Sequence, residues 1–297
     1  MYHLNEICNK IDEEFFLLDS TQNTFVDKIT TPLNADDKSL VFISPGRTDK
    51  QELFDKTNAA IVICDASIDL TDASNKCVIV VKDPKYLFAK LAKAFFSETP
   101  KYEIHPTAII HPDAIIHPNV SIGSNTYIGK CEIKSNTIIY GNCYLYDNVE
   151  IAENVIIHAG AIIGAEGLGH IKGPDGRYLS FPHIGKVIIE SHVEIGTNSC
   201  IAKGALNDTV IKKGTIIDSF VQVGHNVLIE ENVLILANCV IGGSSIIKKE
   251  AVLAIGAHIC DYITVGEKAH IGPGAIVINQ VPPGAKVVTR SPMVLTQ

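Results

Sequence analysis

The stretch IKKGTIIDSFVQVGHNVLIEENVLILANCVIGGSSIIKKEAVLAIGAHICDYITVGEKAHIGPGAIV (211–277) carries an isoleucine, leucine or valine at every sixth position. These positions are Ile211, Ile217, Val223, Ile229, Ile235, Ile241, Ile247, Leu253, Ile259, Val265, Ile271 and Val277. An amphipathic helix has a period of 3.6 residues and an alternating strand a period of 2, so neither explains the spacing. A six-residue repeat is typical of a parallel β-helix, in which each group of six residues, a hexad, forms one flat side and points its aliphatic residue into a shared core.

The same period extends over most of residues 101–288. It begins at Ile104, shifts by one residue at Ile133 and returns after an interruption at Ile189. With three hexads in each coil, the chain is expected to form about eight coils. Two interruptions break the period: residues 164–186 leave the repeat, and four extra residues precede Ile211. Insertions in a solenoid tend to gather on the binding face, so the longer one is a candidate substrate loop. A loop that only shields a subunit interface is the alternative.

The first 100 residues lack the hexad period and predict a small α/β domain. Short apolar runs at 40–44, 59–65 and 76–81 read as strands. Residues 83–96 read as a helix, because Asp83 can cap its N-terminus, a proline suits its first turn and its apolar residues form one stripe. We therefore expect an α/β domain at 1–100, a β-helix domain at 101–288 and a short C-terminal tail at 289–297.

Composition limits the class of protein. The 297 residues have a formal net charge of −8, which argues against nucleic-acid binding, since phosphate contacts need concentrated lysine and arginine. The N-terminal residues do not form a signal peptide, and no run of 18 apolar residues predicts a membrane span. The eight cysteines lack pairing or metal-ligand spacing and predict free, mostly buried thiols in a reducing compartment. Together these features predict a cytoplasmic protein.

Three histidines in IHP triplets, His105, His111 and His117, raise the possibility of a metal site. Residues six apart lie on different sides of a triangular coil, whereas residues 18 apart stack on the same side. The three side chains should therefore diverge, and a zinc ion needs ligands that converge. We expect no metal site here.

His225, in VQVGHNV (221–227), has a different setting. It lies two residues after the inward Val223, so its side chain should point outward near a corner. Gly243 lies 18 residues further on, and a backbone N–H beside an imidazole suits acyl transfer. The imidazole would accept a proton from the nucleophile and the N–H would bind the oxyanion. A surface histidine beside a turn glycine is the alternative interpretation.

Three segments of the β-helix region resemble the UDP-3-O-acylglucosamine N-acyltransferases of lipid A synthesis. They are HAGAIIGAEGLG (158–169), FPHIGKVIIESHVEIGTNSCIAKGALNDTVI (181–211) and VQVGHNVLI (221–229), the last of which contains His225. The resemblance implies a homotrimer of left-handed parallel β-helices, each with a small N-terminal α/β domain that binds a nucleotide sugar. It further implies transfer of a 3-hydroxyacyl chain from acyl carrier protein to a sugar amine. The catalytic histidine falls on His225 and the oxyanion-hole glycine on Gly243. The neighbouring Asn226 is a candidate substrate-binding residue.

The sequence departs from this family in its nucleotide segment. Phe42, in VFISPGRT (41–48), stands where the family stacks a uracil, but Pro45 and Thr48 occupy the positions of the family's asparagine and tyrosine. Phe42 is therefore a candidate substrate-binding residue, and the identity of the nucleotide base stays open.

Two further departures concern the second functional histidine and the C-terminus. An ungapped match places Tyr262 at the position of that histidine, while His258 lies four residues earlier, so both are candidate substrate-binding residues. The family's C-terminal helices have no counterpart before the chain ends at 290–297. In this respect the sequence is similar to sugar acetyltransferases that use coenzyme A.

We therefore expect an N-acyltransferase that acts on a nucleotide-linked amino sugar, without a tightly bound cofactor. Its co-substrate would be the phosphopantetheine thioester of acyl carrier protein, as in lipid A synthesis. Alternatively it would be acyl-CoA, used on a UDP- or dTDP-amino sugar for a surface polysaccharide. A β-helical scaffold or binding protein, and a β-helical carbonic anhydrase with zinc, are the hypotheses from other classes.

Overall fold

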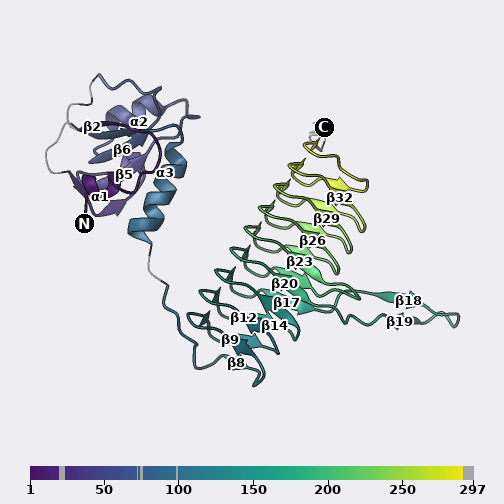
Figure 1. The fold of residues 1–297 in the computed structure, drawn as a ribbon. Coiled ribbons are helices and arrows are strands. Elements are labelled where there is room, and N and C mark those ends of the chain that lie inside the picture. Colours follow the sequence, from purple (N-terminus) through teal and green to yellow (C-terminus); the bar gives the residue numbers. More distant parts are fainter. Residues whose placement is uncertain (20–23, 72, 74–75, 98–99, 290–297) are drawn as a thin grey trace, which may run out of the picture. The chain divides into compact units, whose positions relative to one another are not determined.

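The computed structural model describes residues 1–19, 24–71, 73, 76–97 and 100–289. The chain divides into two compact units, Met1–Pro100 and a second that begins at Lys101 (Figure 1). Of the C-terminal tail expected at 289–297, all but the first residue lies outside the described residues.

The first unit is built on a five-stranded sheet with the order β2-β7-β6-β5-β4. Its strands are β2 (Phe16–Asp19), β4 (Lys28–Ile29), β5 (Ser39–Phe42), β6 (Ile61–Cys64) and β7 (Cys77–Val80). All neighbours pair in parallel except β2, which is antiparallel to β7. A separate antiparallel pair joins β1 (Tyr2–His3) and β3 (Phe25–Val26). The three strands expected from the sequence are β5, β6 and β7, so that prediction is confirmed.

The helices of this unit are α1 (Leu4–Cys8), a 3₁₀ turn at Pro32–Asn34, α2 (Lys50–Lys56), α3 (Pro84–Leu91) and a π-helix at Ala92–Phe96. The Asp83 carboxylate accepts a hydrogen bond from the Tyr86 N–H at 3.0 Å, so Asp83 caps α3 as the sequence predicts. Leu87 and Leu91 are fully buried on the inner face of α3. Among the described residues, no helix has the length and apolar content needed to cross a membrane.

The second unit is a parallel β-helix whose coils stack along one axis (Figure 1). Its first side consists of β10 (Ser121–Ile122), β13 (Ile138–Ile139), β16 (Ile156–Ile157), β21 (Glu194–Ile195), β24 (Ile216–Ile217), β27 (Leu234–Ile235), β30 (Val252–Leu253), β33 (His270–Ile271) and β35 (Lys286–Val287). Its second side consists of β8 (Ile109–Ile110), β11 (Tyr127–Ile128), β14 (Tyr144–Leu145), β17 (Ile162–Ala165), β22 (Cys200–Ala202), β25 (Gln222–Val223), β28 (Val240–Ile241), β31 (His258–Ile259) and β34 (Ile276–Val277). Its third side consists of β9 (Ile115–Ile116), β12 (Glu132–Ile133), β15 (Val149–Ile151), β20 (Val187–Ile189), β23 (Thr209–Ile211), β26 (Leu228–Ile229), β29 (Ile246–Ile247) and β32 (Thr264–Val265).

With nine, nine and eight strands on the three sides, the prediction of about eight coils is confirmed. The aliphatic residue of each hexad points inward, and the stacked Val223, Ile241 and Ile259 are at most 2% exposed. The one-residue shift in the sequence arises because Ser121 pairs with Ile138, which makes that coil 17 residues long. Apolar burial on all three sides stabilises the unit along its whole length.

The corners of the coils need left-handed backbone conformations. Among the described residues, 16 non-glycine residues have a positive φ, and ten of them are asparagine. Asparagine tolerates this region better than other residues with a Cβ. Asn226, Ser244 and Tyr262 share this conformation, with φ near 60°. They lie 18 residues apart and therefore stack along the same corner.

Both interruptions of the repeat project from the β-helix at one level. The longer one contains an antiparallel hairpin, β18 (His170–Lys172) and β19 (Tyr178–Ser180), which extends away from the coils (Figure 1). The shorter one contacts its base, since the Ile184 N–H donates to the Ala205 carbonyl at 2.8 Å. The sequence predicts both excursions but not the strands of the hairpin.

None of the eight cysteines, all of them among the described residues, is paired in a disulfide. Five are buried, and burial raises the pKa of Cys64 to about 12 and that of Cys131 to about 11. Cys260 is exposed, which the expectation of buried thiols did not single out.

Candidate functional site

A cavity of about 670 Å³ lies at the corner between the second and third sides of the β-helix, where both excursions meet. Its lining comes from the hairpin base, the shorter excursion and three stacked corners: Leu168, Gly169, His170, Ile171, Phe181, His183, Ala205, Leu206, Asn207, His225, Asn226, Leu228, Ser244, Ile246 and Tyr262. Residues of both interruptions thus contribute to the lining of this cavity.

The hydrogen bonds of Asn226 determine the tautomer of His225. The Asn226 Nδ2 donates to the Asn207 carbonyl at 2.8 Å, and its Oδ1 accepts from the Ala205 N–H at 3.1 Å. Because the amide is oriented by these two bonds, its Oδ1 can only accept from His225 Nδ1, which lies 2.9 Å away. In the neutral imidazole the proton therefore sits on Nδ1, and Nε2 carries a lone pair. This is the form that a general base requires.

Gly243 lies directly against the His225 ring, as the 18-residue spacing predicts. A Cβ built on Gly243 would lie 2.8 Å from both Cε1 and Nε2 of His225, so any other residue there would displace the imidazole. The expectation of an accessible Gly243 N–H is wrong in this structure, because that N–H donates to Asp261 Oδ1 at 2.6 Å. Asp261 lies one coil further along the same stack, where its short side chain reaches back to the glycine.

Of the remaining candidate residues at this end of the β-helix, Tyr262 and Asn226 line the cavity and His258 does not. Tyr262 lines the cavity, and its N–H donates to the Gly243 carbonyl at 3.0 Å. His258 lies on β31 between Val240 and Ile276, faces outward from the second side and does not line the cavity. Asn226 lines the cavity too, but its amide is engaged in holding His225 and the shorter excursion.

His183 is a cavity residue that the sequence analysis did not identify. Its ring lies edge-on to His225, with centroids 5.3 Å apart and an interplanar angle of 74°. It belongs to the longer excursion, where the repeat gives no side-chain direction. The segment FPHIG (181–185) therefore carries no periodic signal that could have placed it.

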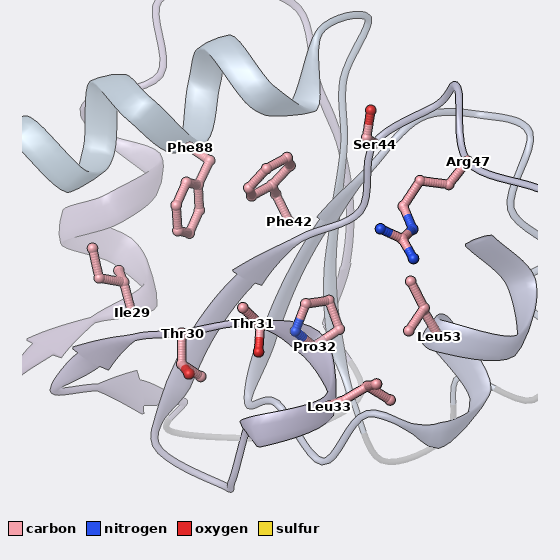
Figure 2. Close-up of a pocket in the computed structure, with 10 residues that line it drawn as sticks. All are labelled: Ile29, Thr30, Thr31, Pro32, Leu33, Phe42, Ser44, Arg47, Leu53 and Phe88. Atoms are coloured by element: carbon pink, nitrogen blue, oxygen red, sulfur yellow. The ribbon is translucent and has the colours of Figure 1, made fainter. Parts of the chain in front are cut away.

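The α/β unit contains a second cavity, of about 750 Å³, lined mostly by apolar side chains (Figure 2). Phe42 on β5 and Phe88 on α3 form one wall, with ring centroids 4.8 Å apart and a tilt of 38°. Ser44 and Arg47 also line it, whereas Pro45 and Thr48 do not. The Arg47 guanidinium forms a two-bond pair with the Asp49 carboxylate at 2.6 and 2.7 Å.

The histidines of the IHP triplets serve local structure. The Nδ1 atoms of His105 and His111 accept hydrogen bonds from backbone N–H groups two residues later, at 3.2 and 3.1 Å. The Nε2 of His117 contacts Glu132 at 3.2 Å. Within the part of the chain that the structure describes, no group of three or more His, Cys, Asp or Glu side chains could hold a metal ion.

Known proteins share the repeat and parts of the sequence. The family "Bacterial transferase hexapeptide (six repeats)" matches residues 130–165 and 208–243, and the second match contains both His225 and Gly243. UDP-3-O-acylglucosamine N-acyltransferases of Methylobacterium nodulans and Caulobacter sp. are 39% and 37% identical over 124 and 123 residues. These matches cover 42% and 41% of this chain and 35% and 36% of the relatives. The chain thus spans about a third of the length of the curated relatives it matches.

Solved structures agree at the level of the fold. The UDP-N-acetylglucosamine acyltransferase of Francisella novicida has a TM-score of 0.56 at 24% identity, over 61% of this chain and 64% of that chain. The Campylobacter jejuni enzyme of the same name has a TM-score of 0.55 at 21% identity, over 61% and 69%. Fold and repeats therefore define the class of the chain: a parallel β-helix protein with hexapeptide repeats. Within that class, the chain resembles the UDP-3-O-acylglucosamine N-acyltransferases, as its sequence predicts.

Proposed function

We propose that the chain is an N-acyltransferase that moves an acyl group from a thioester to the amine of a nucleotide-linked amino sugar. The observation that carries the proposal is the contact of His225 Nδ1 with Asn226 Oδ1 at 2.9 Å, which leaves Nε2 as a base beside Gly243 at the cavity. The acceptor would be a UDP-3-O-acylglucosamine, in agreement with the names of the curated relatives.

In the proposed mechanism, the amine nitrogen attacks the thioester carbonyl while His225 Nε2 accepts one of its protons. The tetrahedral intermediate then collapses, the C–S bond breaks and the imidazolium returns the proton to the leaving thiolate. A general base of this kind typically contributes on the order of 10²–10⁴-fold to the rate. The Gly243 N–H would bind the oxyanion, for which the thioester oxygen must displace the Asp261 carboxylate.

The donor would be a 3-hydroxyacyl chain on the phosphopantetheine arm of acyl carrier protein. Acyl-CoA is the alternative, because both thioesters end in the same pantetheine arm. The apolar part of the cavity lining, which includes Leu206, Leu228 and Ile246, suits an acyl chain.

The cavity beside Phe42 would bind the base of the nucleotide sugar, because an apolar slot with an aromatic wall suits a planar ring. With Pro45 and Thr48 away from this slot, polar recognition of the base would fall to Ser44 or Arg47. Reaction within the cytoplasm belongs to the same proposal, since the acyl donors in question are intracellular.

A homotrimer is also part of the proposal. The outward residues of the second side include Ile109, Tyr144, Ile162, Val240 and Ile276, all of them exposed in the single chain. This row, which is mostly apolar but also contains the exposed Gln222 and His258, suits burial against further copies of the same chain.

The test is acyl transfer by the purified protein with two donors, 3-hydroxyacyl carrier protein and acyl-CoA, and with UDP- and dTDP-amino sugars. We expect amide formation with UDP-3-O-acylglucosamine and the carrier-protein donor. His225→Ala should lower kcat at least about 100-fold, while His270→Ala, which changes an exposed histidine on β33, serves as the matched control. Unchanged turnover in His225→Ala would contradict the mechanism, and activity with acyl-CoA alone would contradict the carrier-protein donor.

A further inference from the structure

His183 holds a buried hydrogen-bond acceptor without a partner beside the cavity. Its Nδ1 lies 3.0 Å from the Phe181 carbonyl, which can only accept, so Nδ1 carries the proton and Nε2 a lone pair. The residue is 4% exposed. Among the residues that the structure describes, its Nε2 is the one buried side-chain nitrogen or oxygen without a hydrogen-bond partner. Such a group is costly for stability, and in native proteins it calls for an explanation in function or an unseen partner.

The position of this atom relates it to the proposed chemistry. His183 and His225 line the same cavity, and their rings meet edge to face. Gly167 lies between them: a Cβ built on it would be 2.9 Å from His183 Nε2 and 3.0 Å from His225 Cδ2. Glycine at this position thus keeps the space between the two imidazoles free of a side chain. The same glycine therefore packs against His183 Nε2 and against the His225 ring, whose centroid lies 5.3 Å from that of His183.

Two hydrogen-bond acceptors suit an amine nucleophile better than a hydroxyl nucleophile. A hydroxyl group has a single proton, which the general base removes. A primary amine has two N–H bonds, so one is left when the base takes the other. In the transition state this second N–H becomes a stronger donor, because the nitrogen gives up electron density to the carbonyl carbon.

We propose that His183 Nε2 accepts a hydrogen bond from the second N–H of the attacking amine, and so selects amines over hydroxyls as acyl acceptors. The inference rests on the proposed acyl transfer. One proton passes from nitrogen through His225 to the leaving thiol as the C–N bond forms and the C–S bond breaks. The second proton stays on nitrogen, becomes the amide N–H and donates to His183 throughout.

The amine reaches this acceptor when the segment Gly167–Gly169 shifts. Cβ atoms built on Gly167 and Gly169 would lie 2.9 and 3.0 Å from atoms of the His183 ring, so this segment covers it. The segment is a loop between β17 and β18, and two of its three residues are glycine. Movement there leaves the hydrogen bonds of the coils intact.

The experiment compares two acceptors, UDP-3-O-acylglucosamine and the matched UDP-3-O-acylglucose, which has a hydroxyl in place of the amine. His183→Leu removes the acceptor, and we expect kcat/KM for the amine to fall about 10- to 100-fold, as for a hydrogen bond made in the transition state. The slow reaction of the hydroxyl substrate should stay within about twofold. His183→Gln keeps an acceptor oxygen and should retain most of the selectivity.

Thermal unfolding separates this role from a purely structural one. His183→Leu removes an unpaired buried acceptor, which favours stability, but also the Nδ1–H that donates to the Phe181 carbonyl, so its Tm should stay within a few degrees of that of the wild type. An unchanged ratio of kcat/KM for the two acceptors would overturn the inference, and so would an equal loss for both. If the wild-type protein transfers no acyl group to either acceptor, the proposed function itself has failed.

Discussion

The Asp261 carboxylate accepts a hydrogen bond from the Gly243 N–H, which the proposed oxyanion site needs. A hydrogen bond to a charged acceptor contributes about 1.5–3 kcal/mol, which the thioester oxygen must replace. Asp261→Ala should leave the Gly243 N–H free, and we expect kcat/KM for the acyl donor to rise by about tenfold or more. Steady-state kinetics with the donor varied would measure this change. Asp261→Asn, which keeps an oxygen acceptor but not the charge, should give a smaller rise. A large loss of activity in Asp261→Ala would instead give Asp261 a part in the reaction.

The same residues mark the limit of prediction at this scale. The pair His225 and Gly243 could be predicted because the repeat determines which residues stack. The engagement of the Gly243 N–H by Asp261 could not, because it depends on a side-chain rotamer that the repeat leaves open. His183 was missed because its neighbours in the sequence follow no period. The cavity residues that lie in the repeat were thus predictable, and those in the excursions were not.

Among the elements, the strands of the β-helix were predictable and the hairpin was not. Each short strand lies where a hexad predicts it, since one aliphatic residue per side must reach the core. The strands β18 and β19 contribute no residue to that core, so their sequence is free of its spacing. Their exposure is consistent with a role outside the stability of the coils.

Removal of the hairpin tests whether β18 and β19 are dispensable for the stability of the coils. The Phe181 N–H donates to the Gly169 carbonyl at 2.7 Å, so a two-residue Asn-Gly turn could replace residues 170–180. We expect Tm to change by only a few degrees, because the deleted side chains are largely exposed. The KM for at least one substrate should rise about tenfold or more, since His170 and Ile171 line the cavity. As a control, shortening only the outer turn at 173–176 should preserve kcat/KM. A fall in Tm beyond about 10 °C would show that the hairpin supports the coils.

For the whole molecule, the β-helix could be predicted because its hexad pattern repeats along most of the chain. The hexads define the β-helix, and apolar runs between polar segments define the α/β unit. The core pattern does not determine the outward side chains, which make the contacts with other chains. The oligomeric state must therefore be inferred from exposed residues, and it remains open to a direct test.

The mostly apolar row of exposed residues on the second side predicts association. Light scattering should give a mass about three times the chain mass of 32.1 kDa. Ile276, which is 67% exposed on β34, lies in this row. Ile276→Glu should shift the population toward single chains, because a buried unpaired carboxylate would oppose association. Its circular dichroism should stay that of the wild type, since the side chain points away from the core. Tyr86→Glu, which places the same charge on the exposed face of α3, should leave the mass unchanged. A wild-type mass equal to one chain would contradict the assembly and would require the cavity at His225 to function within a single copy.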